Sequence, residues 1–325
     1  VEIAYGDLHD RLLISLQAGG EGAPDISDVE QGAFGSFLRS GEPGFVDLSE
    51  RLTEGGYLED IVAERLALYS YNDAIYGVEH ALTPDVLYYR QDIWAEYGYD
   101  PAEFVTWDEF IAAAAEIAAD SGSAAIPVWG ELHQILLRQR GGDYFNADGD
   151  ITIDSELSID TMNWILAQIE TGVAMQMPDG DATWAAFNDG TFTSMIGADW
   201  YAGFFKDNAP DLAGSWAVAP LPVWEEGGSQ TSVWGGTGAT IIESSDNVEA
   251  AWDFLSFAML SIEGNVNRYE LTNLYPPYIP AMDDERLLAP DPYFGGQPIG
   301  EVFAAVAPTT PAQYQSPFRT FLQEQ

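Results

Sequence analysis

The 325-residue sequence contains no cysteine, which excludes disulfides, thiolate zinc sites and cysteine nucleophiles. Basic residues are also scarce: 11 stand against 53 acidic ones, Lys206 is the single lysine, and the formal charge is −42. Such a charge repels nucleic acid and anionic membrane surfaces, so neither is expected as a partner. The sequence has no apolar run near the ~20 residues that a membrane span requires, and no signal peptide at Val1.

Catalytic and metal-binding patterns are missing too. The three histidines, His9, His80 and His133, have no metal-ligand spacing, and no GxSxG motif occurs. The glycine-rich stretch Gly235–Gly238 precedes a predicted strand instead of opening a helix, which disfavours a phosphate-binding loop. Two carboxylates at glycosidase spacing would arise by chance among so many acids, so such a pair would not by itself indicate a glycosidase. We therefore expect no enzymatic activity, no metal and no cofactor.

The acidity has two interpretations. In the first, it is a solvated surface suited to high salt, because the Debye length falls to about 3 Å at molar salt and carboxylate repulsion is then screened. This predicts a fold that loosens in dilute buffer. In the second, the acids form a site for a polycation or a metal, although carboxylates scattered so evenly do not mark one.

Hydrophobic residues make up 46% of the chain and aromatic residues 13%, so a folded protein with a large core is expected. A strand at Glu2–Tyr5, a helix at Leu8–Ala18 and a strand at Pro24–Val29 follow one another. This order predicts an α/β lobe with a parallel sheet and helices outside.

Later elements carry clearer local signals. Thr106 and Glu109 form a capping-box pattern that opens a helix from Trp107 to about Ala119. Asp246 is predicted to cap another helix. The remaining predicted elements are the strands Val86–Tyr89, Ala125–Trp129, Thr193–Gly197 and Ala239–Ile242, and the helices Asp92–Gly98, Leu132–Arg140, Ser158–Glu170 and Asp181–Asp189.

The segment Asn146–Asp150 superficially matches a calcium loop. Its glycine falls in the wrong place, and no glutamate stands where an EF-hand needs one. A hairpin turn into Ile151–Ile153 is favoured instead, because Asp-Gly is a preferred turn pair.

Five motifs occur in the order found in the family 1 extracellular solute-binding proteins of carbohydrate ABC importers, which are related to maltose-binding protein. The sequence resembles that family throughout most of its length, with Arg90-Gln91-Asp92 where Asn-Lys-Asp is usual. The motifs are Tyr76–Phe110 (with LYYRQD and VTWDEF), Phe187–Trp200, Trp216–Pro222 (WAVAPLP), the glycine-rich Val233–Gly238 with the helix after it, and Tyr293–Gln297 (YFGGQ).

The resemblance implies a two-lobed α/β fold of the periplasmic-binding-protein class (type II, Venus-flytrap) with several crossings between lobes. Lobe 1 would hold residues 1–88 and 235–285, and lobe 2 residues 89–234 and 286–325, with crossings near 87–90, 232–235 and 281–288. A first strand and helix of the family are expected upstream of Val1, and a terminal helix after Phe318. The signal and anchor region would then lie outside this sequence.

The resemblance also implies a binding protein, extracellular or periplasmic and lipid-anchored, that holds a sugar or oligosaccharide in a cleft between the lobes. A monomer that delivers its ligand to the membrane permease subunits of an ABC importer is expected. Two alternatives stay open: a polyamine or other organic-cation binder of the same fold, since aromatic rings and carboxylates hold cations well, and a secreted glycoside-active enzyme.

Candidate ligand residues combine aromatic faces, which pack on the C–H faces of a sugar, with polar groups that bond its hydroxyls. For the tryptophans in irregular segments, which are Trp129, Trp200 and Trp234, contact with a ligand and packing in the protein interior are equally expected. His80 has the alternative of an ordinary loop histidine, and Arg90 is expected to pair with an acid. The candidates are Glu30, Gln31, Glu79, His80, Trp129, Glu131, Asp199, Trp200, Tyr201, Trp234, Gly235, Gly236 and Tyr275.

Overall fold

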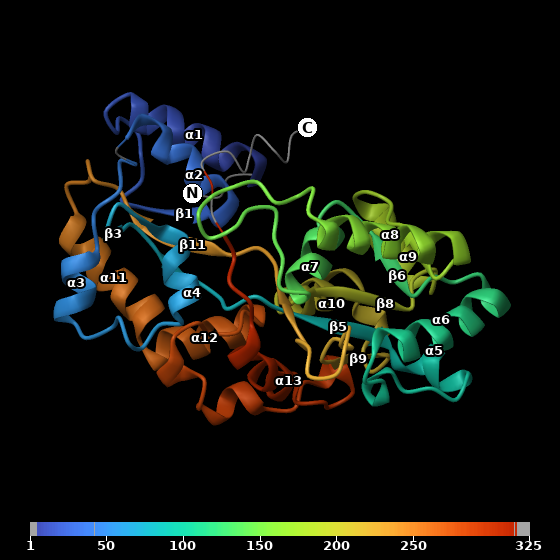
Figure 1. The fold of residues 1–325 in the computed structure, drawn as a ribbon. Coiled ribbons are helices and arrows are strands. Elements are labelled where there is room, and N and C mark those ends of the chain that lie inside the picture. Colours follow the sequence, from blue (N-terminus) through green and yellow to red (C-terminus); the bar gives the residue numbers. More distant parts are fainter. Residues whose placement is uncertain (1–4, 42, 315, 317–325) are drawn as a thin grey trace. The chain divides into compact units, whose positions relative to one another are not determined.

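The computed structural model describes residues 5–41, 43–314 and 316 (Figure 1). Most of the predicted strand Glu2–Tyr5 lies outside these residues, and Tyr5 begins helix α1 (Tyr5–Gln17) instead. No helix in the described ranges combines the length and the apolarity that crossing a bilayer would take.

The chain divides into two compact units, each built from separate stretches of sequence. Unit 1 comprises Val1–Leu82, Gly235–Asp284 and Gln313–Gln325, and unit 2 comprises Thr83–Trp234 and Glu285–Ala312. These boundaries differ from the predicted lobes in two places. The first boundary follows Leu82 instead of residue 88, because β5 (Pro84–Arg90) pairs along its length with strands of unit 2. The described residues from Gln313 onward belong to unit 1, where Gln313 Nε2 donates to Gly235 O.

Unit 1 contains a three-stranded sheet in the order β1-β11-β4. The strands are β1 (Ile26–Glu30), β11 (Thr237–Ile241) and β4 (Val78–Glu79), and both pairings are antiparallel. The parallel sheet predicted here is therefore wrong for the described strands, because β11 lies between the other two and runs against both. Glu30 lies opposite Thr237, and Glu79 lies opposite Gly238, so the ends of the three strands meet at one edge.

Helices surround this sheet and supply its core. Leu48, Leu52 and Leu255 are buried together with Ile241 of β11. Helix α11 starts after Asn247, so the predicted cap at Asp246 is wrong by one residue. The other elements of unit 1 are α2 (Gln31–Phe37), α3 (Ser49–Glu54), α4 (Ala63–Leu66), the hairpin of β2 (Ser70–Tyr71) and β3 (Ala74–Ile75), α11 (Val248–Leu260) and α12 (Ile262–Thr272).

Unit 2 is built around β5, whose seven residues are all buried. β5 pairs antiparallel with three strands, and a parallel pair lies beside them, where Thr193 N donates to Ala124 O. The fully apolar sequence of β5 at Val86–Tyr89 suits a strand covered on both faces. The other strands are β6 (Ile126–Val128), β7 (Ala174–Gln176), β8 (Ser194–Ala198), β9 (Trp216–Ala219) and β10 (Ser232–Val233).

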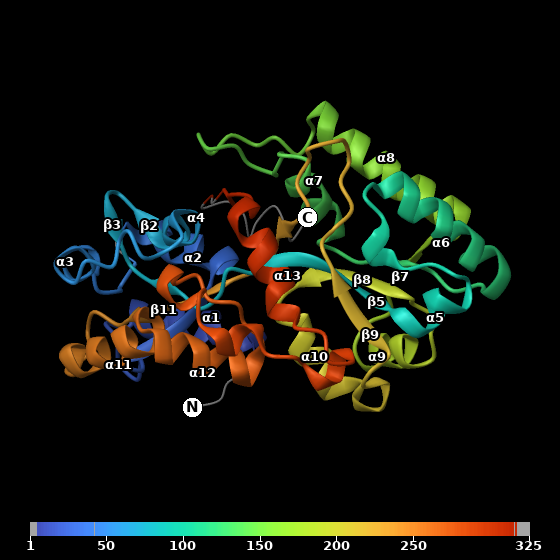
Figure 2. The same cartoon turned by 90° about the horizontal axis from the view of Figure 1, so that it is seen from below.

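Helices cover both faces of this sheet, as Figure 2 shows for unit 2. Leu87 and Tyr89 face a core formed with α6, α7 and α8, while Tyr88 on the opposite face contacts Phe205 of α10. The capping box that opens α6 is confirmed, with Thr106 Oγ1 accepting from Glu109 N at 3.3 Å. The helices are α5 (Gln91–Glu96), α6 (Trp107–Ser121), α7 (Leu132–Gln139), α8 (Glu156–Thr171), α9 (Asp181–Asn188), α10 (Tyr201–Asn208) and α13 (Ile299–Val306).

The turn predicted at Asn146–Asp150 is confirmed, but the strand after it does not form. A single antiparallel bridge joins Phe145 to Ile151. Asn146 Oδ1 accepts from the backbone N–H groups of Asp148 and Asp150, so the side chain itself closes the turn. No group of three or more His, Asp or Glu residues in the described part of the chain is placed to hold a metal ion.

Candidate functional site

Four of the predicted aromatic residues form one cluster in unit 2, which we call the aromatic cluster: Trp129, Trp200, Tyr201 and Trp234. The Trp234 ring lies edge-on to Trp129, with centroids 4.4 Å apart, and tilted against Trp200 at 4.6 Å. Trp200 stacks on Tyr201 at 4.4 Å. Three chain segments that are distant in sequence therefore meet at this point.

The strand ends explain why these rings meet. Trp129 follows β6, Trp200 and Tyr201 follow β8, and Trp234 follows β10. β6 lies beside β8 and runs parallel to it, since the bridge from Ala124 to Phe192 is parallel. The carboxyl ends of neighbouring parallel strands reach the same edge of a sheet, which is where open α/β folds bind ligands.

Acidic groups surround the aromatic cluster. Asp199 is fully buried, and its Oδ1 accepts from Trp200 N at 2.8 Å, which fixes the start of α10. Burial raises the pKa of the Tyr201 hydroxyl, and the nearby charges of Glu131 and Asp85 raise it further. The predicted residues Glu131 and Asp199 therefore lie with the aromatic cluster.

Sequence reasoning missed two buried residues beside this cluster, Asp85 and Arg138. Asp85 is 0% exposed and Arg138 is 1% exposed. Arg138 Nε donates to Asp143 Oδ2 at 2.9 Å, and Nη1 donates to Val233 O at 3.0 Å. A charged residue directly before the apolar run Val86–Tyr89 was the signal that could have identified Asp85.

A second group of predicted residues gathers at the strand ends of unit 1, which we call the polar edge: Glu30, Gln31, Glu79, His80, Gly235 and Gly236. Backbone contacts hold it together. Gln31 N donates to Gly236 O at 2.9 Å, and His80 N donates to Thr237 O at the same distance. The Glu30 side chain accepts from Gly32 N at 2.7 Å, and Glu30 N donates to His9 Nε2 at 2.9 Å.

A buried ion pair explains the glycine at position 236. Arg65 Nη2 donates to Glu79 Oε2 at 2.8 Å, and both side chains are at most 2% exposed. The same Arg65 nitrogen contacts Gly235 O at 3.2 Å. Gly236 has φ +130°, and a Cβ there would lie 2.0 Å from Arg65 Nη2 and 2.7 Å from Glu79 Oε2. Only glycine fits this position without displacing the pair.

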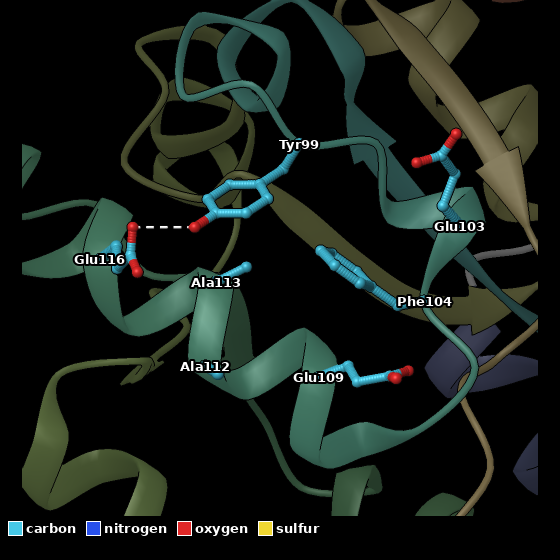
Figure 3. A pocket seen from close by; sticks show the side chains of 7 residues that line it. All are labelled: Tyr99, Glu103, Phe104, Glu109, Ala112, Ala113 and Glu116. Atoms are coloured by element: carbon cyan, nitrogen blue, oxygen red, sulfur yellow. Dashed lines mark hydrogen bonds between the residues drawn. The ribbon is translucent and has the colours of Figure 1, made fainter.

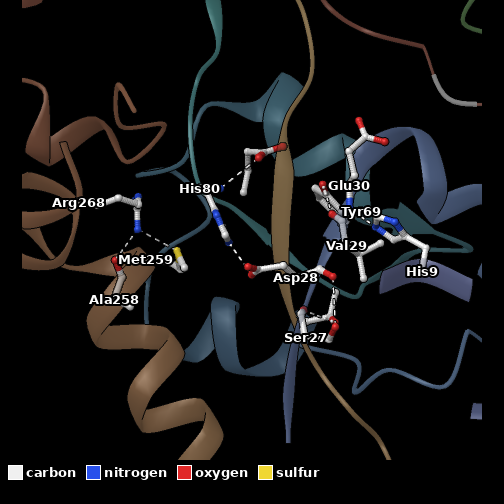
Figure 4. Close-up of polar contacts among 12 residues, drawn as sticks. His9, Ser27, Asp28, Val29, Glu30, Tyr69, His80, Ala258, Met259 and Arg268 are labelled. Atoms are coloured by element: carbon white, nitrogen blue, oxygen red, sulfur yellow. Dashed lines mark hydrogen bonds and ion pairs between the residues drawn. The ribbon is translucent and has the colours of Figure 1, made fainter. Parts of the chain in front are cut away.

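His80 is a partly buried residue of the polar edge instead of an ordinary surface histidine. Its Nε2 lies 3.0 Å from Asp28 Oδ1, and its side chain is 16% exposed. Figure 4 shows His80 directed at Asp28, and Arg268 directed at Ala258 and Met259.

Burial works to raise the pKa of Asp28, but the contact with His80 and the charges of His80, Arg268 and His9 lower it on balance. Burial also lowers the pKa of Arg268 to about 10.

Two further predictions concern single residues. Arg90 pairs with Asp92 at 2.8 Å, so the expected acid partner is confirmed. Tyr275 is 1% exposed, its ring lies edge-on to Tyr269, and its carbonyl accepts from Leu82 N. Burial raises the pKa of its hydroxyl to about 12. Tyr275 is thus a buried residue of unit 1, and its role toward a ligand stays a prediction.

An open hollow of about 390 Å³ lies beside α6 (Figure 3). Tyr99 and Phe104 form its apolar walls. The carboxylate of Glu116 accepts from the Tyr99 hydroxyl at 2.8 Å, and that of Glu109 bonds the backbone at Val105 and Thr106. None of the predicted ligand residues lines it; the lining is Tyr99, Glu103, Phe104, Glu109, Ala112, Ala113 and Glu116.

Similarity to known proteins agrees with the sequence resemblance. The chain is 31% identical to the arabinooligosaccharide-binding protein of Halalkalibacterium halodurans over 281 residues, covering 84% of this chain and 62% of that protein. The arabinooligosaccharide-binding protein of Bacillus subtilis is also 31% identical, over 84% of this chain and 64% of its own length. The chain therefore spans less than two thirds of either relative.

The fold has close counterparts among solved structures. The ABC-transporter-associated binding protein of B. animalis subsp. lactis, solved with β-1,6-galactobiose, superposes with a TM-score of 0.82 at 21% identity. The match covers 97% of this chain and 80% of that one. The predicted two-lobed solute-binding fold is thereby confirmed. Residues 1–261 match the family described as bacterial extracellular solute-binding protein, and the chain belongs to that family.

Proposed function

We propose that this protein is the extracellular or periplasmic substrate-binding component of an ABC importer, and that its ligand is a sugar or an oligosaccharide. The observation that carries the proposal is the aromatic cluster with acidic and guanidinium groups beside it at the carboxyl ends of β6, β8 and β10. The binding of arabinooligosaccharides by relatives 31% identical supports the same ligand class.

The chemistry of the two clusters suits such a ligand. Partly exposed indole faces offer apolar surface for the C–H faces of a sugar ring. Glu131 and Asp199 of unit 2 offer acceptors for hydroxyl groups, and charged or amide groups add donors. In unit 1, the polar edge offers Glu30, Gln31, Glu79 and His80 with the backbone at Gly235 and Gly236. Tyr275, a buried residue of unit 1, belongs to this proposal as well.

The proposal extends to partners and location. The ligand-bound protein, a monomer anchored by lipid at the cell surface, would present the sugar to the membrane permease subunits of its importer. It would release the sugar unaltered, since binding requires no acid-base pair. The acidic surface would serve a high-salt environment.

A polyamine ligand is less well supported by these contacts. A polyamine site needs several free carboxylates along one groove, whereas Glu79 is neutralised by Arg65, and Asp143 by Arg138. Both clusters mix acids with arginine, glutamine or tryptophan, as expected for a neutral polyhydroxylated ligand.

A thermal-shift screen in molar salt tests the proposal. The panel is arabinobiose, arabinotriose, lactose, β-1,6-galactobiose and spermidine, each at millimolar concentration. A sugar present at a hundredfold over its Kd raises the free energy of unfolding by about 2.7 kcal/mol. If spermidine alone stabilises the protein, the ligand is a cation and not a sugar. New reducing ends after incubation with the oligosaccharides would indicate an enzyme.

A further inference from the structure

Three groups beside the aromatic cluster are buried and have no hydrogen-bond partner among the described residues. They are both carboxyl oxygens of Asp85, Nη2 of Arg138 and Nε1 of Trp129. Buried polar groups in native proteins nearly always bond to protein, water or a ligand. This set contains hydrogen-bond donors and acceptors together, so we expect a polar ligand to bond to it.

The register of the sheet places Asp85 under the segments that carry the rings. Asp85 lies opposite Ser232 of β10 and opposite Ala198 of β8. Trp234 comes two residues after Ser232, and Trp200 two residues after Ala198. Asp85 alternates with Leu87 and Tyr89, so it faces the side of the sheet on which Trp129 and Trp234 pack.

Charge interactions connect Asp85 with Arg138 and with Tyr201, and Tyr201 contacts Trp129. The guanidinium of Arg138 is close enough to lower the pKa of Asp85, while burial, the dominant effect, and the charge of Asp199 raise it well above its ordinary value. Asp85 in turn raises the pKa of Tyr201, whose ring lies 6.3 Å from that of Trp129. Tyr201 therefore contacts Trp129 and lies within electrostatic range of Asp85.

Neighbouring hydrogen bonds leave Arg138 with one free direction. Its Nε and Nη1 are occupied by Asp143 and Val233 O, and Asp143 is held in turn by Gln134 Nε2 at 2.6 Å. Arg138 thus cannot turn toward Asp85 without breaking contacts that fix α7 to β10. Its remaining nitrogen donates and the Asp85 carboxyl oxygens accept, so together they match the two roles of a sugar hydroxyl.

We propose that Asp85 and Arg138 are specificity-determining residues of the sugar site in unit 2. In the bound protein, hydroxyl groups of the sugar bond to the Asp85 carboxyl and Arg138 Nη2, while Trp129 Nε1 donates to a further hydroxyl. Asp85 is fully buried, so we expect a ring of the aromatic cluster to turn aside as the sugar enters. The proposal rests on the proposed function and names the residues that select the ligand.

Substitution of Asp85 tests this proposal. The Asp85→Asn variant keeps the volume, one donor and one acceptor, whereas Asp85→Leu removes both. Titration calorimetry in molar salt gives the Kd of arabinobiose and of lactose for each protein, with the exposed Asp179→Asn as control. We expect Asp85→Asn to bind within about threefold of wild type. Asp85→Leu should bind the preferred sugar at least about tenfold more weakly and lose most of the discrimination between arabinobiose and lactose. A site built to bond a hydroxyl group rejects a ligand that lacks it, because the buried polar groups of the site are then left unpaired.

Other outcomes separate the two proposals. If Asp85→Leu weakens both sugars equally, or neither, Asp85 is structural or bonds only internal water, and the inference is overturned while the function stands. If wild type binds none of the sugars, the proposed function itself falls. If Asp85→Leu fails to fold, Asp85→Ala replaces it under the same criteria. Binding of deoxy-arabinobiose analogues to the wild type supplies a second measurement. Loss of at least one hydroxyl must weaken wild-type binding about tenfold, and the same loss must leave the affinity of the Asp85 variant unchanged.

Discussion

At the scale of single residues, Gly236 is constrained by the ion pair beneath it. Its φ of +130° is rarely adopted by residues with a side chain, and a Cβ would lie 2.0 Å from Arg65 Nη2. We expect Gly236→Ala to lower the free energy of unfolding by about 2 kcal/mol or more, because strain and the broken buried pair act together. Denaturant unfolding in molar salt measures it. Gly130→Ala is the matched control, since no atom of the described residues lies within 4 Å of its Cβ position. Equal effects of both changes would contradict the argument.

Asp85 makes a second prediction at this scale, for the pH dependence of stability. Its folded pKa lies well above the unfolded value of about 3.9, with burial as the main cause, Asp199 adding to it and Arg138 opposing it. As pH rises above 4, the unfolded chain releases this proton while the folded protein retains it, so folding loses up to about 1.4 kcal/mol per pH unit. Asp85→Asn removes this loss. Its stability relative to wild type should therefore increase from pH 4 to pH 7 in denaturant unfolding; a constant difference would mean that Asp85 is ionised when folded.

At the scale of elements, the aromatic cluster depends on the ends of three strands, and its rings contact one another. We expect Trp200→Ala and Trp234→Ala each to weaken binding of the sugar found in the screen by about tenfold or more, as for buried aromatic anchors generally. The double variant should lose less than the sum, because their rings lie 4.6 Å apart and share contacts. Calorimetry measures all three. Phe254→Ala, at a residue 61% exposed on α11, is the control and should bind normally.

The same scale shows which features could be predicted from the sequence. The capping box of Thr106 and Glu109 depends on residues three apart, and the position of β5 on its apolar composition, so both were found. The tryptophans of the aromatic cluster were recognisable because they follow strands in irregular segments. By contrast, β11 pairs with β1 across more than two hundred positions of sequence and with β4 across about 160, and no local pattern specifies either pairing. The role proposed for Asp85 depends on Arg138 and on ring positions that only the folded sheet brings together.

At the scale of the whole molecule, charge is the dominant feature. With 53 acidic residues and 11 lysines and arginines, at least 42 acids have no lysine or arginine to pair with one to one. Two of the ion pairs, Arg65 with Glu79 and Arg138 with Asp143, are buried and well shielded from salt, so screening acts mainly on the surface excess. We expect the melting temperature to rise by several degrees between dilute buffer and 1 M NaCl, most steeply below about 0.3 M, where the Debye length shortens fastest. Differential scanning calorimetry measures this. A series in sucrose at equal osmolality separates charge screening from the general exclusion of solutes from the protein surface. A melting temperature that does not change in NaCl, or that rises equally in sucrose, would show that repulsion among the carboxylates does not limit the stability of this fold.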